Sequence, residues 1–224
     1  MTRKFLILFT LLFAMGCSFS TYGFGISGPT VEPPIPAAGS VLFQDDFSNP
    51  ASGWERVNDA EGIMDYDDGV YRILVKAPHL NYFATPGKAF NDTRVEVDLV
   101  KIDGPDDNLA GIICRMSQVG DSAFYYFFII TNSGYYSVGR AEGDRGILLG
   151  QTALAQSSAI KTGLAINHLR ADCVGSILSF YVNGFLVAQV TDTTLTGGEV
   201  GVIAGVFDEA NVDMVFDEFI VLQP

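Results

Sequence analysis

The chain has 224 residues, with 26 acidic and 13 basic side chains and a formal net charge of −13. A protein this acidic is poorly suited to bind nucleic acid or to adsorb directly on anionic lipid. The acids are spread along the chain, which is typical of a solvated surface and is also compatible with calcium binding.

The start of the chain predicts an export signal. Arg3 and Lys4 precede an apolar run at 5–15, and a small residue stands just before Cys17, which is the layout of a cleaved signal peptide. The run is too short to cross the roughly 30 Å of a bilayer core as a helix. We therefore expect residues 1–16 to be removed and the protein to reach the cell envelope or the extracellular surface.

Cys17 is the predicted lipidation site. The segment Ala14-Met15-Gly16-Cys17 resembles the lipobox of bacterial lipoproteins, but Ala14 replaces the usual Leu and Met15 replaces a small residue. A lipid on Cys17 would attach the protein to a membrane through its N-terminus only, without spanning the bilayer. The alternative is ordinary cleavage, which leaves Cys17 free or removes it.

Residues 17–39 predict a tether, because they are rich in Ser, Gly and Pro and have no periodic apolar pattern. Residues 40–224 have the size of a single β domain. Short β-rich runs there alternate with Gly, Asn and Asp turns, which predicts an all-β, two-sheet antiparallel jelly-roll sandwich. The expected strands are 41–47, 62–66, 70–76, 80–85, 94–102, 109–116, 123–131, 135–140, 147–149, 163–172, 176–182, 185–191, 199–207 and 212–222.

Two segments allow more detailed predictions. The Asn-Gly pair at 183–184 favours a hairpin with a type I′ turn, which would place Val182 opposite Phe185 and Phe180 opposite Val187. The run 124–130 is apolar on both faces, which predicts a central strand that the opposite sheet covers on one side. The hairpin residues expected to share the core face are Leu178, Phe180, Val182, Phe185 and Val187.

Cys114 and Cys173 lie in separate predicted strands. An oxidising compartment would allow them to pair, and the bond would stabilise the fold by about 4 kcal/mol in the chain-entropy model. The alternative is two buried thiols that never meet. Zinc is not expected, because there is no CxxC pair and the two histidines, His79 and His168, lie far apart in the sequence.

Several short motifs follow one another along the chain at 43–47, 53–54, 69–71, 125–127, 134–136, 167–170, 180–184 and 215–219. Their order resembles that of exported laminin-G/concanavalin A-like domains of bacterial lipoproteins, related to the 3-keto-disaccharide hydrolase-like group. The resemblance covers about residues 41–222 and implies a jelly-roll whose first and last strands are adjacent. It does not imply one activity, because this fold hosts lectins, hydrolases and inert spacers.

A catalytic site has limited support in the sequence. Concanavalin A-like hydrolases of glycoside hydrolase family 16 carry Glu-x-Asp-x-x-Glu on one strand. Here Glu96 and Asp98 match the first two acids, but Lys101 replaces the third. Glu96 and Asp98 also fit the solvent-facing side of an outer strand. Neither His79 nor His168 lies near a nucleophile motif such as G-x-S-x-G.

The candidate metal ligands are acidic residues near the two terminal strands. Asp45 and Asp46 belong to the first strand region and Asp217 to the last, so adjacent terminal strands could bring their oxygens to a calcium ion. A second oxygen-rich loop spans 103–108. The alternative for both groups is a set of solvated acidic turns.

A glycan site would use aromatic rings on a sheet face or a rim loop, and the candidates are Trp54, Tyr82 and Tyr135. Such rings also pack in cores or between hairpins. Taken together, the sequence favours an exported, lipid-anchored, non-catalytic carbohydrate-binding module. The alternatives are a structural or protein-binding spacer and a divergent glycoside or keto-disaccharide hydrolase.

Overall fold

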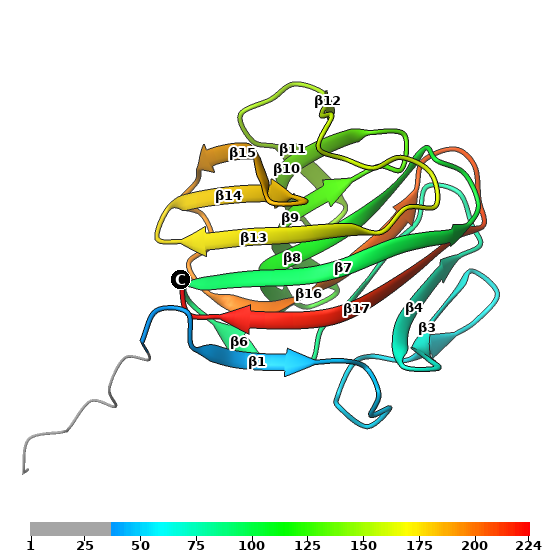
Figure 1. Ribbon diagram of the computed structural model, residues 1–224, viewed down its shortest axis with the longest axis horizontal. Helices are drawn as coiled ribbons and strands as arrows, with labels where there is room; N and C mark the ends of the chain where they lie inside the picture. The colour runs from blue at the N-terminus through cyan, green and yellow to red at the C-terminus, as the bar shows by residue number, and fades with distance from the viewer. Residues whose placement is uncertain (1–36) are drawn as a thin grey trace, which may run out of the picture. The chain divides into compact units, whose positions relative to one another are not determined.

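The computed structural model describes residues 37–224. The predicted signal peptide, Cys17 and most of the predicted tether lie outside the described residues. Two antiparallel sheets pack face to face (Figure 1), which confirms the expected two-sheet sandwich. The described residues contain no helix that is long and apolar enough to cross a membrane.

Sheet A forms the front layer of Figure 1 and has nine strands. Its order is β15-β14-β13-β7-β17-β4-β3-β2, and β1 also pairs with β17, so the first and last strands are neighbours as expected. The strands are β1 (Val41–Asp45), β2 (Val57–Asn58), β3 (Gly62–Asp67), β4 (Val70–Val75), β7 (Thr93–Asp103), β13 (Asn167–Val174), β14 (Ile177–Val182), β15 (Phe185–Thr191) and β17 (Val212–Leu222).

Sheet B forms the rear layer and has eight strands in the order β11-β10-β9-β8-β16-β5, with β12 beside β10 and β6 beside β16. The strands are β5 (Asn81–Ala84), β6 (Ala89–Phe90), β8 (Asn108–Val119), β9 (Ser122–Ile130), β10 (Tyr135–Glu142), β11 (Arg145–Leu148), β12 (Ala155–Gln156) and β16 (Gly198–Val206).

The core lies between the sheets and follows from the two-residue period of the strands. On β7, Val95, Val97 and Leu99 are buried, whereas Glu96 and Asp98 face away from the core. This arrangement confirms the alternation predicted for that strand. The run predicted as a central strand is β9, which lies between β8 and β10 and is covered by sheet A on one side.

The Asn-Gly hairpin forms as predicted, with φ values of 50° at Asn183 and 84° at Gly184. Val182 is opposite Phe185, but a register shift pairs Phe180 with Ala188 in place of Val187. The predicted register is therefore wrong beyond the turn, because a bulge adds one residue to β15. Phe185 is 66% exposed and does not join the core.

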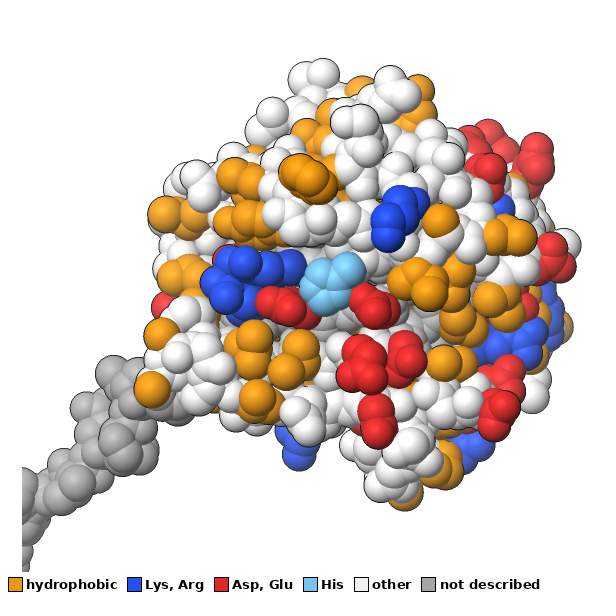
Figure 2. Space-filling view, viewed as in Figure 1, with side chains coloured by type: hydrophobic (Ala, Val, Ile, Leu, Met, Phe, Trp, Pro, Cys, Tyr) orange, Lys and Arg blue, Asp and Glu red, His pale blue; other side chains and the backbone are white. Residues whose placement is uncertain are grey.

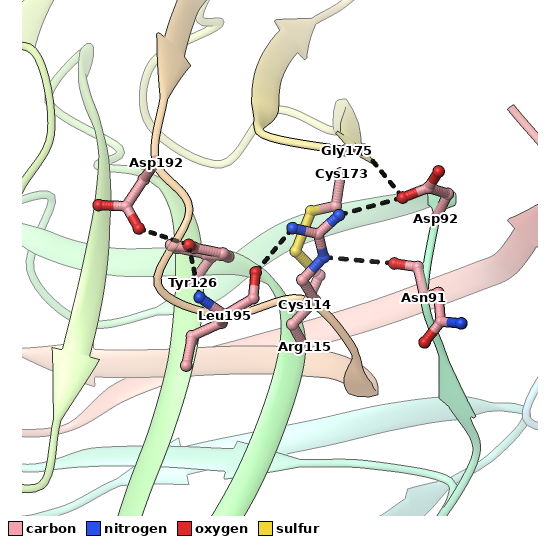
Figure 3. The surroundings of a disulfide bond; sticks show 9 residues. All are labelled: Asn91, Asp92, Cys114, Arg115, Tyr126, Cys173, Gly175, Asp192 and Leu195. Carbon is pink, nitrogen blue, oxygen red and sulfur yellow. Dashed lines mark hydrogen bonds and ion pairs between the residues drawn. A yellow bond between two sulfur atoms is a disulfide. The ribbon is translucent and has the colours of Figure 1, made fainter.

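A disulfide joins Cys114 on β8 to Cys173 on β13 (Figure 3). Since β8 belongs to sheet B and β13 to sheet A, the bond links the two layers through the core. The predicted pairing is confirmed. A disulfide of this kind is typical of proteins that fold in an oxidising compartment.

Arg115 lies next to the disulfide and is fully buried. Its guanidinium donates to the carbonyls of Asn91 and Leu195 and to the carboxylate of Asp92 (Figure 3). The same carboxylate accepts a hydrogen bond from the backbone of Gly175. Arg115 therefore connects the loops that precede β7 and β16 to strand β8. Its buried charge is paired with the carboxylate of Asp92.

Candidate functional site

A cleft of about 720 Å³ lies on the outer face of sheet B, which is the face turned away from sheet A. Alternation along β9 builds its centre: Tyr125, Phe127 and Ile129 face the cleft, while their sequence neighbours enter the core. Ala123, near the start of β9, also lines the cleft. The remaining apolar lining comes from the other strands and the loops: Leu80, Phe83, Leu109, Ala141, Leu148, Ala153, Leu154, Ile203 and Phe207.

Aromatic rings form much of the cleft floor. The rings of Phe83 on β5 and Tyr125 on β9 lie 5.3 Å apart between centroids, at an interplanar angle of 50°. The ring of Phe127 lies over Gly139 on β10, where a Cβ atom would come within 2.1 Å of it. Gly139 is thus required for Phe127 to rest against the sheet, because any side chain there would displace the ring.

One buried hydroxyl in the cleft lining has no partner. Ser137 on β10 lies opposite Ile129 in the cross-strand register and is 1% exposed. Within residues 37–224, three buried side-chain polar atoms lack a hydrogen bond, on Thr93, Asn132 and Ser137, and of these residues Ser137 alone lines the cleft. Leaving such a group unpaired costs about 1–3 kcal/mol, so a polar ligand atom beside Ser137 would remove that cost.

Tyr125 adds a second hydroxyl to this environment. Burial raises the pKa of Tyr125, so the phenol stays protonated at neutral pH and can donate a hydrogen bond. The charged and amide groups of the cleft lie toward the two ends of its strands, near the start and the end of β8. At the first end they are His79 and Asn81, and at the second they are Gln118, Asp121, Asp144 and Arg145.

The acids that matched the hydrolase motif lie on the opposite side of the molecule. Glu96 and Asp98 face outward from sheet A, where His168 stands between them, 3.5 Å from the Glu96 carboxylate and 2.7 Å from that of Asp98. Figure 2 shows this face, with a histidine flanked by acidic side chains. These carboxylates therefore have no access to the cleft on sheet B.

Lys101 occupies the place of the third acid and is buried on the core-facing side of β7. Its ammonium pairs with Asp106 and with the carbonyl of Gly104. The oxygen-rich loop at 103–108 thus already receives a cation from the protein itself. Because Lys101 is buried and paired within the protein, β7 lacks the third acid of the glycosidase motif.

The carboxylates predicted to bind calcium accept hydrogen bonds from nearby groups of the protein. Asp45 accepts hydrogen bonds of 2.9 Å from the Phe47 backbone and from the Trp54 indole. The hydroxyl and backbone of Ser48 lower the pKa of Asp46.

Asp217 accepts a hydrogen bond from the backbone of Glu218. Asp45 and Asp46 do border a hollow of about 570 Å³ together with Glu218, as neighbouring terminal strands require. Nevertheless, no three His, Cys, Asp or Glu side chains in the described part of the chain gather in a way that could hold a metal ion. The structure therefore gives the calcium prediction no support.

None of the three predicted glycan-binding aromatics lines the cleft. Trp54 is 4% exposed and packs against the rings of Phe47 and Phe219, so it cannot offer a face to a ligand. Tyr82 packs against the core, and its hydroxyl donates to Asp59. Tyr135 is 39% exposed at the start of β10, outside the cleft.

The cleft residues were missed although the sequence carried a signal for them. A sandwich core requires only one apolar face of a strand, yet the run at 124–130 is apolar on both. The second face is the one that forms the cleft floor. No comparable signal marks Ser137, because its importance comes from burial and from the absence of a partner.

No protein-family model and no curated protein sequence matches the chain. Solved structures do match. The carbohydrate-binding module CBM66 from Bacillus subtilis is 19% identical, with a TM-score of 0.52 over 76% of this chain and 95% of that one. A protein of unknown function with a galectin-like fold from Bacillus subtilis is 13% identical, with a TM-score of 0.64 over 84% and 97%.

The β-glucanase of Bacillus licheniformis is 9% identical, with a TM-score of 0.58 over 81% of this chain and 97% of that one. At these identities the matches show the fold alone. The chain has a concanavalin A-like, galectin-like β-sandwich, which confirms the fold that the sequence motifs implied.

Proposed function

We propose that this protein is an exported, non-catalytic carbohydrate-binding module whose binding site is the cleft on the outer face of sheet B. The observation that carries the proposal is an aromatic floor beside an unpartnered, buried hydroxyl on Ser137. Sites for small ligands combine a mostly apolar lining with a few well-placed polar groups. Aromatic rings can pack against the apolar faces of sugars while hydroxyls set their orientation.

The fold is one that carbohydrate-binding proteins use. A carbohydrate-binding module and glycoside hydrolases share the two-sheet architecture, and a fold is compatible with many functions. The specific argument therefore rests on the cleft and its side chains.

The carboxylates of the cleft favour binding without turnover. Glycoside hydrolysis uses two carboxyl groups at a defined separation, one of which acts as a general acid with a raised pKa. The cleft lining contains Asp121 and Asp144, and both are exposed at strand-connecting turns. Neither is in the apolar surroundings that a catalytic acid requires.

We also propose export and attachment through a lipid on Cys17. The Cys114–Cys173 disulfide supports export, and the predicted signal supports the anchor. Metabolic labelling with a fatty acid should mark the wild-type chain and leave Cys17→Ser unlabelled. Wild-type protein without label would contradict the anchor, but not the carbohydrate site.

The central experiment is a broad glycan array probed with residues 18–224, which lack the predicted signal and the predicted lipidation site and therefore need no detergent. We expect saturable binding both with calcium and with a chelator. Phe127→Ala should weaken it at least about tenfold, equivalent to about 1.4 kcal/mol, because it removes part of the floor. Tyr181→Phe, on the outer face of sheet A, is the control that should bind normally.

Two outcomes would contradict the proposal. Loss of binding in Tyr82→Ala or Tyr135→Ala, with Phe127→Ala unaffected, would place the site at the aromatics predicted from the sequence and not in the cleft. No binding to any glycan by folded protein would favour a structural or protein-binding module.

A further inference from the structure

We infer that the ligand is a carbohydrate with an apolar substituent, such as an alkyl, acyl or aryl group, and that this substituent occupies the floor of the cleft. The inference rests on the proposed function and narrows its ligand class. It follows from the distribution of polar groups over the cleft, from the dimensions of the floor and from the state of Ser137.

The middle of the cleft has few polar groups for a sugar. Its lining there is apolar, with Phe83, Phe127, Ile129, Ala141 and Ile203 among the residues that form it. A bare sugar pressed onto this surface would bury hydroxyls without partners, which opposes binding. An alkyl, acyl or aryl group would instead gain affinity with each group removed from water.

The floor is long enough for a chain. Tyr125, Phe127 and Ile129 are alternate residues of one strand, and the first and last of them lie roughly 13 Å apart at about 3.3 Å per residue. The cleft volume of about 720 Å³ falls within the range of roughly 300–1,000 Å³ seen for sites of drug-sized ligands. A medium-length alkyl chain can therefore lie along β9.

Most polar side chains of the cleft lie at its two ends, where the sugar of a ligand whose apolar substituent fills the floor would be placed. The charged and amide side chains of the cleft belong to the strand ends and turns, and such groups form strong hydrogen bonds with sugar hydroxyls. Ser137 is the exception, because it is buried beside the apolar floor without a partner. Its hydroxyl suits a single oxygen within the ligand, such as that of an ester or ether link.

The test compares three kinds of probe on residues 18–224, which carry neither the predicted signal nor the lipidation site. They are a panel of octyl glycosides below their micelle-forming concentrations, the matching methyl glycosides, and 1-octanol. Each buried CH₂ contributes up to about fourfold in affinity. We therefore expect the best octyl glycoside to bind at least about a hundredfold more tightly than its methyl counterpart, and at least about tenfold more tightly than octanol.

Two serines provide a matched pair of variants. Ser137→Val removes the unpartnered hydroxyl in the cleft, and Ser179→Val removes a hydroxyl that accepts a hydrogen bond from Gln189 on sheet A. We expect Ser137→Val to unfold at the same temperature as the parent or higher, and to bind the octyl glycoside about three- to tenfold more weakly. Ser179→Val should bind normally.

The outcomes separate the inference from the proposed function. Equal affinity for methyl and octyl glycosides would overturn the inference and leave carbohydrate binding intact. Equal affinity for octanol and octyl glycosides would overturn both, since the sugar would then contribute nothing. No binding of any octyl glycoside would overturn the inference, and the glycan array would decide the function separately. Unchanged binding in Ser137→Val would contradict the role given to that hydroxyl.

Discussion

The outer faces of the two sheets differ in the side chains that cover them. Along the outer face of sheet A, Arg94 pairs with Asp172, Arg72 with Asp213, and His168 with Asp98, and Figure 2 shows these charge types along the middle of that face. The outer face of sheet B carries an apolar cleft. A sandwich can fold with both outer faces solvated, so the apolar face exceeds what folding requires and is where a ligand is expected.

Strand β9 shows the same contrast within a few residues. Phe128 contacts Phe180 of sheet A in the core, with ring centroids 5.7 Å apart, whereas Phe127 lies over Gly139 in the cleft. The side chains are identical and adjacent in the chain. Their different roles follow only from the face of the sheet to which each belongs.

The largest expected loss of stability comes from replacing Phe128, and replacing Phe127 provides the comparison. Phe128→Ala should lower the free energy of unfolding by about 3–5 kcal/mol, because it leaves a cavity in a closed core. Phe127→Ala should cost about 1–2 kcal/mol, since its half-exposed ring has less contact to lose. Urea denaturation measures both. Similar costs for the two variants would mean that the cleft floor is a second core.

Removal of the disulfide should have the next largest effect. The bond joins residues separated by 59 positions, and the double variant Cys114→Ala/Cys173→Ala should lose about 4 kcal/mol of stability. Ligand binding by the fraction that remains folded should be unchanged, because the bond lies between the sheets and the cleft lies outside them. Weaker binding at full folding would show that the two regions are coupled.

Acid should reduce the stability of the protein. Burial would raise the pKa of Asp192, but hydrogen bonds from Tyr126 and Thr194 and the charge of Arg140 outweigh it and hold the pKa at about 2. A carboxyl whose pKa is lower in the folded state contributes stability above its unfolded pKa of about 3.9, and loses that contribution as the pH falls through the folded value. Unfolding measured between about pH 5 and pH 2 should show the decline.

Asp172 should act in the same direction. Burial would raise its pKa, and Arg170 and Arg94 lower it more strongly. Asp192→Asn should therefore reduce the acid dependence without abolishing it. An unchanged dependence in this variant would show that Asp192 is not one of the groups responsible.

The smallest expected effect is at an exposed ion pair of sheet A. The side chains of Arg56 and Asp65 are 57% and 32% exposed, and such pairs contribute about 0–1 kcal/mol. Arg56→Ala should lower stability by less than about 1 kcal/mol, and the difference should shrink further in high salt. A larger loss would show that the charged face contributes to folding as well as to solubility.

Much of the fold could be predicted because its rules are local. The alternation on β7 determines that Val95 and Val97 are buried, and the Asn-Gly pair at 183–184 determines the turn, since both positions need positive φ. The disulfide was predictable from the expected oxidising compartment and from two cysteines on separate predicted strands. The alternation and the turn depend only on a few neighbouring residues, and the disulfide prediction depends on the redox state of the compartment.

Only the tertiary structure determines which side chains line the cleft on sheet B. Adjacent residues on β5, Tyr82 and Phe83, are both aromatic, and only the placement of the strand in sheet B turns Phe83 to the cleft. Trp54 is a core residue because the fold packs its ring against Phe47 and Phe219, and the Asp45 carboxylate accepts a hydrogen bond from its indole. Composition and periodicity indicate which residues alternate, but which face is covered, and whether a buried hydroxyl such as that of Ser137 finds a partner, depends on contacts between segments far apart in the chain.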